Sequence, residues 1–539
     1  MSPVQLLPHQ REALQHALAT GGNSILAHAT GSGKGLTSLA IAERLRAEGT
    51  VQRVLVIAPA SLRFNYFNQV LKKFAPSRKS VFIKAPYEKG NVEGGLGFEA
   101  ITPSYDYYVM SGALLRLLGA DAVYRKIQPD LIIADEVHEA RNQTTGYYRE
   151  LKALRDKVGR FLGLTGSPSS NSPGDLAALL NLARGTDMSN AAITSRYFKK
   201  VPVKAPVGLL GIRKKTIGHN LVVRNQGRLA SEISRYMHVV SKEQVDASAG
   251  DRMPYPHVTR EKVEVPMSPV QEKFYQFAFG KVDPKIRERI RNGLPVSQKE
   301  ATHVFSQITA ARQASNAIHL FNSQLTPEDS VEHVPKIQRL LQDVSVHLKT
   351  TPDARIIIYT HMIRGGVDVV EAGLKKLGLP YVTFTGPMSP RTKSQAEEAF
   401  RSGQSQIIIV SQAGEKGLNF PDTTFVAMLD GHFNPEKLYQ AESRGIRAGG
   451  QAHRPPHQRH VIVKYYTSVL PNAPSRAGQM LGRFTGGTRT VEQWMQSIAN
   501  TKAEQNALVK QAIASQGVTR SASAQMLPPP AQHQNPYLN

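Results

Sequence analysis

The sequence predicts an α/β protein with two lobes, each built on a parallel β-sheet flanked by helices. In the first third, short apolar runs alternate with helical patterns in the order SILAH, LTSLAIAERLRAEG, RVLVIAP, DLIIADE and FLGLTGS. The same alternation returns later as RIIIYTH, VVEAGLKKLG, YVTFTG, SQAEEAFRSG, QIIIVS and TFVAMLD. Because parallel strands need crossover helices between them, this alternation indicates one parallel sheet in each region.

The domain organisation follows from where this alternation stops. We expect the first lobe over residues 1–185 and the second, with a final helix, over residues 331–515. Between them, residues 186–330 contain basic amphipathic stretches such as KIRERIRNG, which predict helical insertions, and a Pro-containing, loop-rich piece around 201–218. Residues 516–539 are rich in Pro and Gln and poor in large apolar groups, so they are predicted to be disordered.

The composition favours a polyanionic partner. The 67 Lys and Arg residues outnumber the 42 Asp and Glu residues and give a formal charge of +25. Such an excess attracts nucleic acid before any specific contact forms, although a basic soluble surface is the alternative interpretation. The chain has no cysteine, which excludes disulfides, thiolate zinc sites and cysteine nucleophiles. No signal peptide and no run of about 18 apolar residues is present, so we expect a soluble, intracellular protein that does not enter a membrane.

A candidate phosphate-binding loop lies in the stretch HATGSGKGLTS, between an apolar run and a helical pattern. Gly31 and Gly33 allow backbone amides to approach phosphate oxygens, and Lys34 can reach the β- and γ-phosphates of a nucleotide. A phosphate loop carries Ser or Thr after this lysine, because the hydroxyl binds magnesium, but here the residue is Gly35. A glycine-rich turn before an ordinary helix is the alternative interpretation.

Two adjacent carboxylates end the apolar run in LIIADEVHEA. Asp135 could hold magnesium through water while Glu136 polarises the attacking water, which is why this chemistry needs two acids together. Taken alone, the pair could equally be two solvated acids at a strand end. Its position about 100 residues after Lys34 favours the catalytic interpretation.

The second half contains a complementary set of basic residues. In QAESRGIRAGG, Arg444 and Arg447 are three positions apart and would share one face if the segment is helical. Two guanidinium groups can clamp phosphoryl charge, and an arginine in this role is worth about 10³ to 10⁵ in rate. A solvated basic helix is the alternative. Upstream, VSQAGEKGLNF offers small and hydroxyl-bearing residues that suit close approach of a phosphate backbone.

The order of the motifs resembles that of superfamily-two helicases and, within them, the Swi/Snf-type DNA translocases. LLPHQREAL is similar to the adenine-sensing motif, and ATGSGKG, APASLRFNYF, ADEVHEA and LTGSPSSN resemble motifs I, Ia, II and III. REKVEVPMSPVQEKFYQF resembles the segment that these translocases carry between their lobes. RIIIYTHM, FTGPMSP, SQAGEKGLNF, LDGHFNP and QAESRGIRAGG resemble motifs IV to VI, and TVEQWMQSIANTKAEQ resembles the bracing helix. The resemblance covers about residues 6–511.

The resemblance implies two RecA-like lobes that close on ATP and magnesium while duplex DNA runs across both. The resemblance makes Gln10 the adenine sensor. The residues that the resemblance places at the nucleotide are Gln10, Thr30, Gly31, Ser32, Gly33, Lys34, Gly35 and Gln440. The resemblance implies that Asp135 holds magnesium through water. The catalytic residues that the resemblance implies are Lys34, Asp135, Glu136, Arg444 and Arg447. The residues that it places near the DNA backbone are Ser61, Gly386, Ser411 and Gln412. Contacts to the backbone position a protein without reading sequence.

Two features depart from the family pattern. Ser38 shares a helix face with Gly35 but lies about 4.5 Å further along the axis, whereas magnesium bonds at about 2.1 Å. We therefore expect a water in place of the missing hydroxyl, and an ATPase with weakened metal affinity rather than none. The second departure is an insertion at residues 469–489, to which the sequence assigns no role.

The expected function is that of a DNA-dependent ATPase that moves along double-stranded DNA and remodels protein–DNA complexes, acting as a monomer on DNA. An RNA-acting DExH helicase is the first alternative, because the string DEVH is present. A non-hydrolysing, nucleotide-gated DNA-binding protein is the second, supported by Gly35 alone. The sequence does not indicate the biological process.

Overall fold

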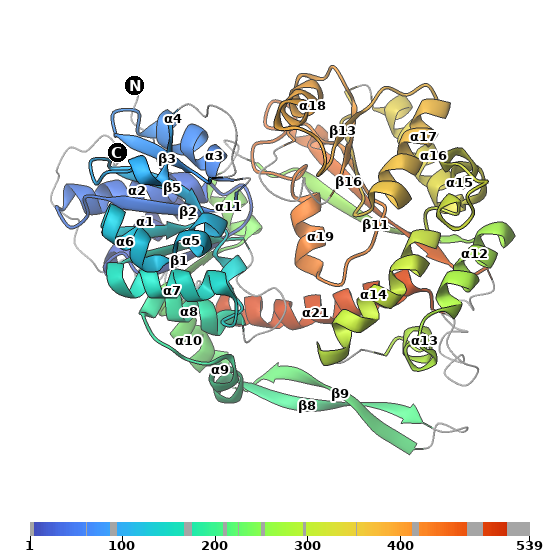
Figure 1. Ribbon diagram of the computed structural model, residues 1–539, viewed down its shortest axis with the longest axis horizontal. Coiled ribbons are helices and arrows are strands. Elements are labelled where there is room, and N and C mark those ends of the chain that lie inside the picture. The colour runs from blue at the N-terminus through green and yellow to red at the C-terminus, as the bar shows by residue number, and fades with distance from the viewer. Residues whose placement is uncertain are drawn as a thin grey trace. The chain divides into compact units, whose positions relative to one another are not determined.

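The structure is a computed structural model of the chain. It describes residues 5–60, 62–86, 94–166, 175–207, 213–224, 226–249, 254–294, 298–351, 353–411, 420–471 and 489–514. The predicted disordered tail and most of the insertion at 469–489 lie outside these ranges. The chain divides into two compact units (Figure 1). The first lobe comprises Met1–Lys199, Leu221–Met253 and Glu504–Asn539, and the second comprises Lys200–Asn220 and Pro254–Ala503.

The first lobe is built on an eight-stranded sheet in which all the strand pairs are parallel. Its strand order is β10 (Met237–Val240), β1 (Ser24–His28), β7 (Phe161–Thr165), β6 (Leu131–Ala134), β2 (Val54–Ala58), β5 (Tyr107–Ser111), β3 (Ser80–Lys84) and β4 (Gly95–Gly97). Its helices include α1 (Pro8–Ala19), α2 (Lys34–Ala47), α5 (Gly112–Leu118), α6 (Ala120–Ile127), α7 (Gly146–Val158), α8 (Asp175–Arg184), α9 (Asn190–Tyr197), α10 (Gln226–Tyr236) and α11 (Lys242–Ala249).

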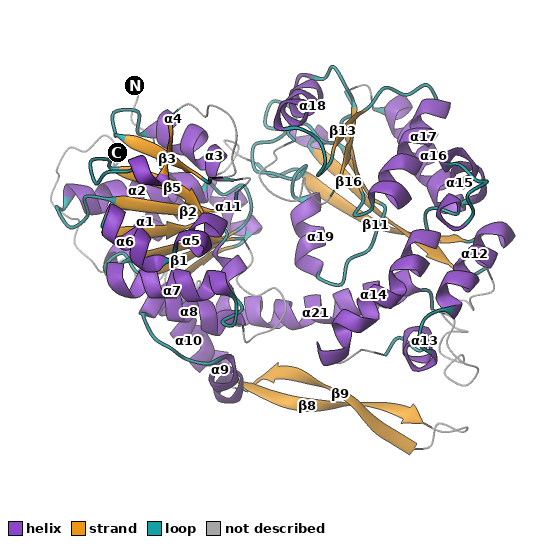
Figure 2. Cartoon of the chain, in the orientation of Figure 1, coloured by secondary structure: helices purple, strands orange, loops and turns teal. Residues whose placement is uncertain are grey.

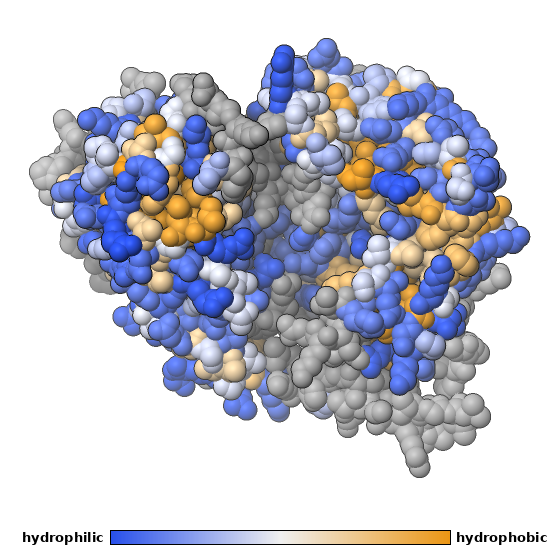
Figure 3. Space-filling view, viewed as in Figure 1, coloured by the Kyte–Doolittle hydropathy of each residue, from blue (hydrophilic) through white to orange (hydrophobic). Residues whose placement is uncertain are grey.

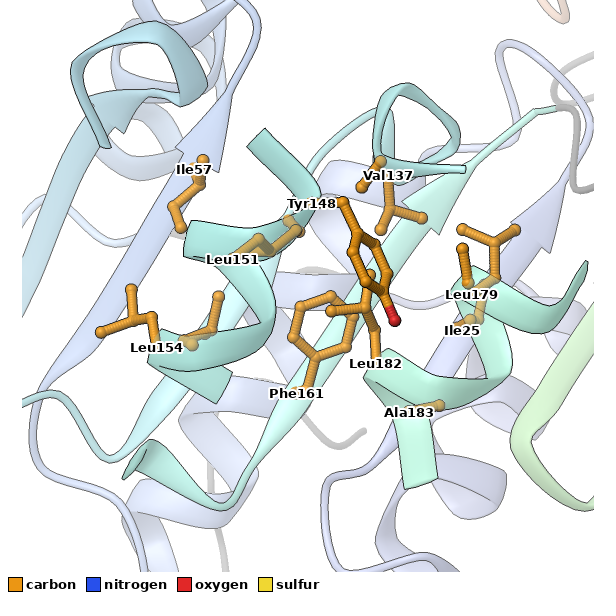
Figure 4. Packing of buried hydrophobic residues seen from close by; sticks show 14 of the residues in the cluster. Ile25, Ile57, Val137, Tyr148, Leu151, Leu154, Phe161, Leu179, Leu182 and Ala183 are labelled. Carbon is orange, nitrogen blue, oxygen red and sulfur yellow. The ribbon is translucent and has the colours of Figure 1, made fainter. Parts of the chain in front are cut away.

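Both faces of this sheet are buried, because successive side chains of a strand point to opposite faces. Ile25 of β1 belongs to one hydrophobic core and its neighbour Leu26 to the other. Figure 4 shows part of the first core, which includes Leu151 of α7 and Phe161 of β7. The continuous apolar runs in the sequence are therefore the central strands of a covered sheet.

The second lobe is built on a six-stranded sheet that also contains only parallel pairs. Its strand order is β11 (His257–Pro266), β16 (His460–Val469), β15 (Phe425–Met428), β12 (Ile356–Tyr359), β14 (Ile407–Val410) and β13 (Val382–Phe384). Its helices include α12 (Pro269–Gly280), α13 (Pro284–Arg291), α14 (Gln298–Ala314), α15 (Pro327–His333), α16 (Pro335–Thr350), α17 (Asp368–Lys376), α18 (Pro390–Ser402) and α19 (Pro435–Glu442). The predicted fold class, two parallel-sheet α/β lobes flanked by helices, is confirmed (Figure 2).

The middle of the chain holds more β-structure than the sequence predicts. The piece expected to be loop-rich forms a two-stranded sheet from β8 (Phe198–Val207) and β9 (Arg213–Val223). Each strand of such a ribbon keeps one unpaired edge, where proline is tolerated, so the prolines that indicated a loop misled the prediction. Beyond it, β10 joins the first sheet and β11 joins the second. The predicted helices of this region are present as α10 to α14.

The helix that follows the second sheet is α21 (Val491–Ala514), at the position predicted for a bracing helix. Trp494 is fully buried and its indole N–H donates to the Leu294 carbonyl at 2.8 Å. The Glu492 carboxylate lies 2.6 Å from Nζ of Lys336, and both residues are buried. The beginning of α21 is therefore anchored in the core of the second lobe.

Hydrophilic side chains cover most of the face shown in Figure 3. Hydrophobic patches lie between them in the same view (Figure 3). Large exposed apolar side chains in the described ranges include Leu117 and Phe277. No helix in those ranges is long and apolar enough to cross a bilayer.

Candidate nucleotide site

The phosphate loop connects β1 to α2. The N-cap of α2 is Gly33 at φ 80°, and Gly31 lies at φ 89°, both in the region that favours glycine. A Cβ on Gly33 would also overlap Nε2 of Gln10. Lys34 is the first residue of the helix, whose free N–H groups and dipole favour an anion at this end. The loop therefore has the backbone of a phosphate-binding site, as the sequence predicted.

The side chain of Lys34 lies along the base of this loop. Its Nζ donates to the carbonyls of His28 at 3.0 Å and Ala29 at 3.3 Å. A lysine ammonium can donate three hydrogen bonds, and in a phosphate loop this group reaches a phosphate oxygen. The loop carbonyls hold the ammonium at the N-terminal end of α2, where anion binding is favoured.

Ser32 presents a polar atom that calls for a ligand. The residue is 2% exposed, and its Oγ has no hydrogen-bond partner among the described residues. Leaving a buried hydroxyl unsatisfied costs about 1 to 3 kcal/mol. Its carbonyl accepts from Nε2 of His9 at 3.0 Å and from Nε2 of Gln10 at 3.1 Å. A phosphate oxygen at the hydroxyl would remove the penalty, so the loop fits the phosphates of a nucleotide.

Gln10 fixes the loop to the beginning of α1. Besides its bond to Ser32, its Oε1 accepts from the Leu7 N–H at 2.9 Å, so both ends of its amide are engaged. A role in sensing adenine stays a prediction. Thr30 faces the neighbouring strand end, because its Oγ1 lies 3.2 Å from where a Cβ on Gly166 would be. The loops that follow β1 and β7 are thus in close contact.

Histidines connect the phosphate loop to β10, the edge strand of the sheet, and to α11. Nε2 of His28, the last residue of β1, lies 2.9 Å from Nδ1 of His238 in β10. His9 bridges the loop to α11, with its Nδ1 2.8 Å from the Ser248 hydroxyl. Burial above all, and then His238 and Lys34, hold the pKa of His28 well below its usual range. Residues beyond position 185 therefore complete this part of the first lobe.

Asp135 directly follows β6, and its N–H donates to the Ile57 carbonyl at 2.8 Å. Burial raises the pKa of Asp135 to about 7, with a further rise from the adjacent Glu136 carboxylate. Lys34 and the N–H of Glu136, which donates to the Asp135 carboxylate at 3.0 Å, oppose the rise without cancelling it. The carboxylate is short of positive charge, and a divalent cation would supply it.

Glu136 has an unusual backbone for a residue with a side chain, at φ 51° and ψ 45°. Its Oε2 lies 3.2 Å from Nδ1 of His138, and that nitrogen lies 3.1 Å from Oγ1 of Thr165 at the end of β7. The imidazole therefore lies beside the Glu136 carboxylate. The sequence analysis gave His138 and Thr165 no role, although both belong to quoted motifs, ADEVHEA and LTGSPSSN.

Magnesium fits this site because the buried Asp135 carboxylate is short of positive charge. Asp135 supplies a carboxylate that lacks compensation, and magnesium commonly takes one or two carboxylates, substrate phosphates and waters. In the described ranges, no group of three or more His, Asp or Glu side chains could hold a metal by itself. The site suits a cation that arrives with a nucleotide rather than one held in a protein cage.

The second-lobe residues lie around the end of α19. Gln440 is in the helix, but the helix ends at Glu442, so Arg444 and Arg447 lie in the turns that follow. The condition under which the two arginines would share a helix face, a helical segment, is therefore not met. The chain turns here because the Arg444 carbonyl accepts from the Phe420 N–H at 3.0 Å. Arg444 is largely buried, whereas Arg447 is half-buried.

Two of the four residues expected near DNA can be located. Gly386 is exposed in the turn after β13, and Ser411 is buried directly after β14. The strands are neighbours, and the Ser411 N–H donates to the Phe384 carbonyl at 3.1 Å. Ser61 and Gln412 lie outside the described residues. DNA contacts by all four stay predictions.

Comparison with protein families decides the relationship. The SNF2-related domain model matches residues 9–320, more than half of the chain, and the helicase conserved C-terminal domain matches residues 335–449. The chain belongs to the SNF2-related family. Its family is one of helicase-like ATPases, as the motif order indicated.

SNF2-related relatives are distant in sequence. A protein of Acanthamoeba polyphaga mimivirus named "Putative ATP-dependent RNA helicase" is 21% identical over 486 residues, which cover 88% of this chain and 91% of the relative. An uncharacterized ATP-dependent helicase of Bacillus subtilis is 23% identical, covering 82% and 73%. An Arabidopsis thaliana ISWI chromatin-remodeling complex ATPase is 23% identical, covering 80% of this chain and 37% of the relative. The chain thus spans just over a third of that plant protein.

Among solved structures, the Sulfolobus solfataricus SWI2/SNF2 ATPase core in complex with dsDNA is similar to this SNF2-related chain. It is 19% identical with a TM-score of 0.38, and the match covers 95% of this chain and 97% of the other. The same core without DNA gives a TM-score of 0.36.

Proposed function

We propose that this protein is a DNA-dependent ATPase that hydrolyses ATP to move along double-stranded DNA. The observation that carries the proposal is a phosphate loop with an unsatisfied buried Ser32 hydroxyl, combined with an undercompensated Asp135 at the same edge of one sheet. The strand order β1, β7, β6, β2 brings the two together, because the carboxyl ends of parallel strands share one edge. The loop suits the negative phosphates of a magnesium–nucleotide complex, and Asp135 suits its positive cation.

The chemistry is divided between the residues as follows. Ser32, Lys34 and the N-terminus of α2 bind and orient the phosphates. Asp135 would hold magnesium together with the nucleotide, and the cation would neutralise phosphate charge. Glu136, which lies beside His138, accepts the proton of the attacking water. Arg444 and Arg447 of the second lobe stabilise transferred charge when the lobes close, and opening after hydrolysis completes one step along the duplex.

Duplex DNA is the proposed partner because of charge and relatives. The formal charge of +25 favours a polyanion. Residues 198–224, which include the β8–β9 ribbon, contain no Asp or Glu but hold Lys199, Lys200, Lys204, Arg213, Lys214, Lys215 and Arg224. Relatives include chromatin-remodeling ATPases and proteins named DNA helicases. We propose that the protein acts on DNA as a monomer, remodels protein–DNA complexes and separates strands little.

The deciding experiment measures ATP turnover without nucleic acid, with duplex DNA and with single-stranded RNA. Stimulation by duplex DNA is the expected result. The matched variants are Lys34→Ala and Glu136→Gln, neither of which should hydrolyse ATP, and normal turnover in either refutes the site. Displacement of a third strand from a triplex, as a function of distance, then tests movement along the duplex.

An RNA-acting helicase is the second candidate, since the mimivirus relative carries that name and the motif here reads DEVH. Stimulation by single-stranded RNA alone would favour it over the DNA motor. Tight, nucleotide-dependent DNA binding without any turnover would instead favour a nucleotide-gated clamp. A pure clamp has no need for Glu136 together with Arg444 and Arg447, which is why we rank it last.

A further inference from the structure

The space beside Gly35 is filled from another helix. Gly35 is the second residue of α2, where a phosphate loop normally carries a hydroxyl. A Cβ on Gly35 would lie 3.0 Å from Cγ2 of Val70 and 3.9 Å from Cε2 of Tyr66. Both residues belong to the helical segment Tyr66–Leu71 that follows β2. A side chain at position 35 would therefore contact this segment, and the ring of Tyr66 lies 3.9 Å from the Cβ position of such a side chain.

The Tyr66 hydroxyl is held in one orientation by Ser38. Tyr66 is 4% exposed, and its oxygen lies 2.8 Å from Oγ of the fully buried Ser38. The Ser38 hydroxyl donates to the Gly35 carbonyl at 2.8 Å, and a serine hydroxyl has only one hydrogen. Tyr66 must therefore be the donor to Ser38. The lone pairs of the phenol oxygen are left to accept a hydrogen bond.

Tyr66 also lies within electrostatic reach of Asp135. Burial raises the pKa of Tyr66 strongly, and the Asp135 carboxylate adds to the rise, so the hydroxyl stays protonated. The hydrogen-bonded group is thus neutral and oriented, and its pKa responds to the carboxylate that we assign to magnesium. A cation-bound water has acidic protons and requires an acceptor.

We propose that Tyr66 replaces the hydroxyl that the phosphate loop lacks, as a positioning residue that accepts a hydrogen bond from a magnesium-bound water. Ser38 orients it, and its ring lies beside Gly35. The inference rests on the proposed function, because it needs a magnesium–nucleotide complex at Asp135. Unlike a loop serine, Tyr66 acts on a water of the cation and not on the cation itself.

The test compares nucleotide binding with and without the metal. The affinity of a fluorescent ADP analogue is measured in excess magnesium and in EDTA for the full-length protein and for Tyr66→Phe, which removes only the hydroxyl. We expect Tyr66→Phe to weaken binding in magnesium about 2- to 13-fold, the worth of one hydrogen bond, with no change in EDTA. Ser38→Ala should give a smaller loss, again only in magnesium.

The matched control is Tyr107→Phe. Tyr107 is a buried tyrosine of the same core, and its hydroxyl donates to Oε1 of Glu43 at 2.6 Å. Loss of the Tyr107 hydroxyl should leave unchanged the ratio of the nucleotide affinity in magnesium to that in EDTA. Equal weakening of Tyr66→Phe in both media, or none in either, overturns the inference while the proposed function stands. If the unaltered protein binds no nucleotide in either medium, both fail.

Discussion

Asp135 and Asp430 occupy similar places in the two lobes but have opposite electrostatics. Asp135 directly follows β6, and Asp430 comes two residues after β15. The carboxylate of Asp430 accepts from Nδ2 of Asn316 at 2.6 Å, Oγ1 of Thr360 at 2.5 Å and the N–H of His361 at 2.8 Å. Burial acts to raise the pKa of Asp430, but Lys336, His361 and Thr360 outweigh it, and the pKa lies below its usual value.

The difference separates a structural carboxylate from one that awaits a ligand. Asp430 finds its partners within the second lobe, so its charge needs nothing from outside. Asp135 receives one backbone donor from Glu136, and its pKa is raised to about 7. A buried group kept short of compensation lowers stability, and such a cost is commonly met at functional sites.

The largest expected effect concerns the residue beside Asp135. Glu136→Gln should lower ATP turnover by about 10²- to 10⁴-fold, because the proton acceptor is lost while the shape is kept. Phosphate release at saturating ATP and DNA measures it. Glu48→Gln is the matched control in the same lobe, since its carboxylate pairs with Arg44 at the surface at 2.8 Å, and it should leave turnover unchanged.

The difference between the two aspartates can be tested by measuring the free energy of unfolding of variants that lack each carboxylate. Asp430→Ala leaves three donors without an acceptor and should lower the free energy of unfolding by about 3 kcal/mol or more. Asp135→Ala should leave it unchanged or raise it, because a poorly compensated carboxylate is removed. Urea unfolding of both variants gives the answer. Equal losses for the two would show that Asp135 is as structural as Asp430.

The histidines near these strand ends give the next effect. The pKa of His28 lies well below 6.5, and burial lowers the pKa of His432 in the second lobe to about 3. Both are neutral when folded and charged when unfolded below pH 6.5, so stability present above that pH is lost as the pH falls. The expected slope is up to about 1.4 kcal/mol per pH unit for each histidine.

Urea titrations between pH 7.5 and 5 measure this slope. His28→Gln should flatten it for the first lobe. His453→Gln is the control, because that histidine is exposed beside Asp422, and its loss should leave the slope as it was. A slope that His28→Gln does not alter would mean that other groups govern acid sensitivity.

The smallest effect concerns Gly35. A Cβ there meets Val70 at 3.0 Å, so Gly35→Ala should be better tolerated when Val70 is also shortened to alanine. A double-mutant cycle should show a coupling of about 0.5 to 1 kcal/mol in unfolding free energy. The matched cycle with Val51→Ala, in the same core but not near Gly35, should show none.

Local patterns predicted the parts of the site that lie within one strand–loop–helix unit. Lys34 and Asp135 were found because each follows a buried strand within a few residues. No role was assigned from the sequence to Tyr66, His138 or Thr165, because the contacts on which we argue for them join distant segments, such as His138 and Thr165 across 27 positions. The strand order that creates these contacts cannot be read from the hydrophobic periodicity of any single strand or helix.

Long-range pairing explains the remaining errors. β11 and β16 form a ten-residue parallel register, from His257 with His460 to Pro266 with Val469, although about 200 residues separate them. The alternation of side chains in either strand gives no sign of the other. The end of α19 before Arg444 was missed for a similar reason, since the Phe420 N–H that fixes the turn comes from an earlier loop.

The pairing of β10 with β1 has a practical consequence for anyone who divides this protein. A fragment that stops at residue 199 keeps every motif of the ATP-binding half but lacks Met237–Val240, which pair with Ile25–His28. Its sheet would end at a bare, apolar β1, the kind of open edge at which chains join one another. Expression of that half as a single soluble piece therefore calls for an end point beyond Ala249.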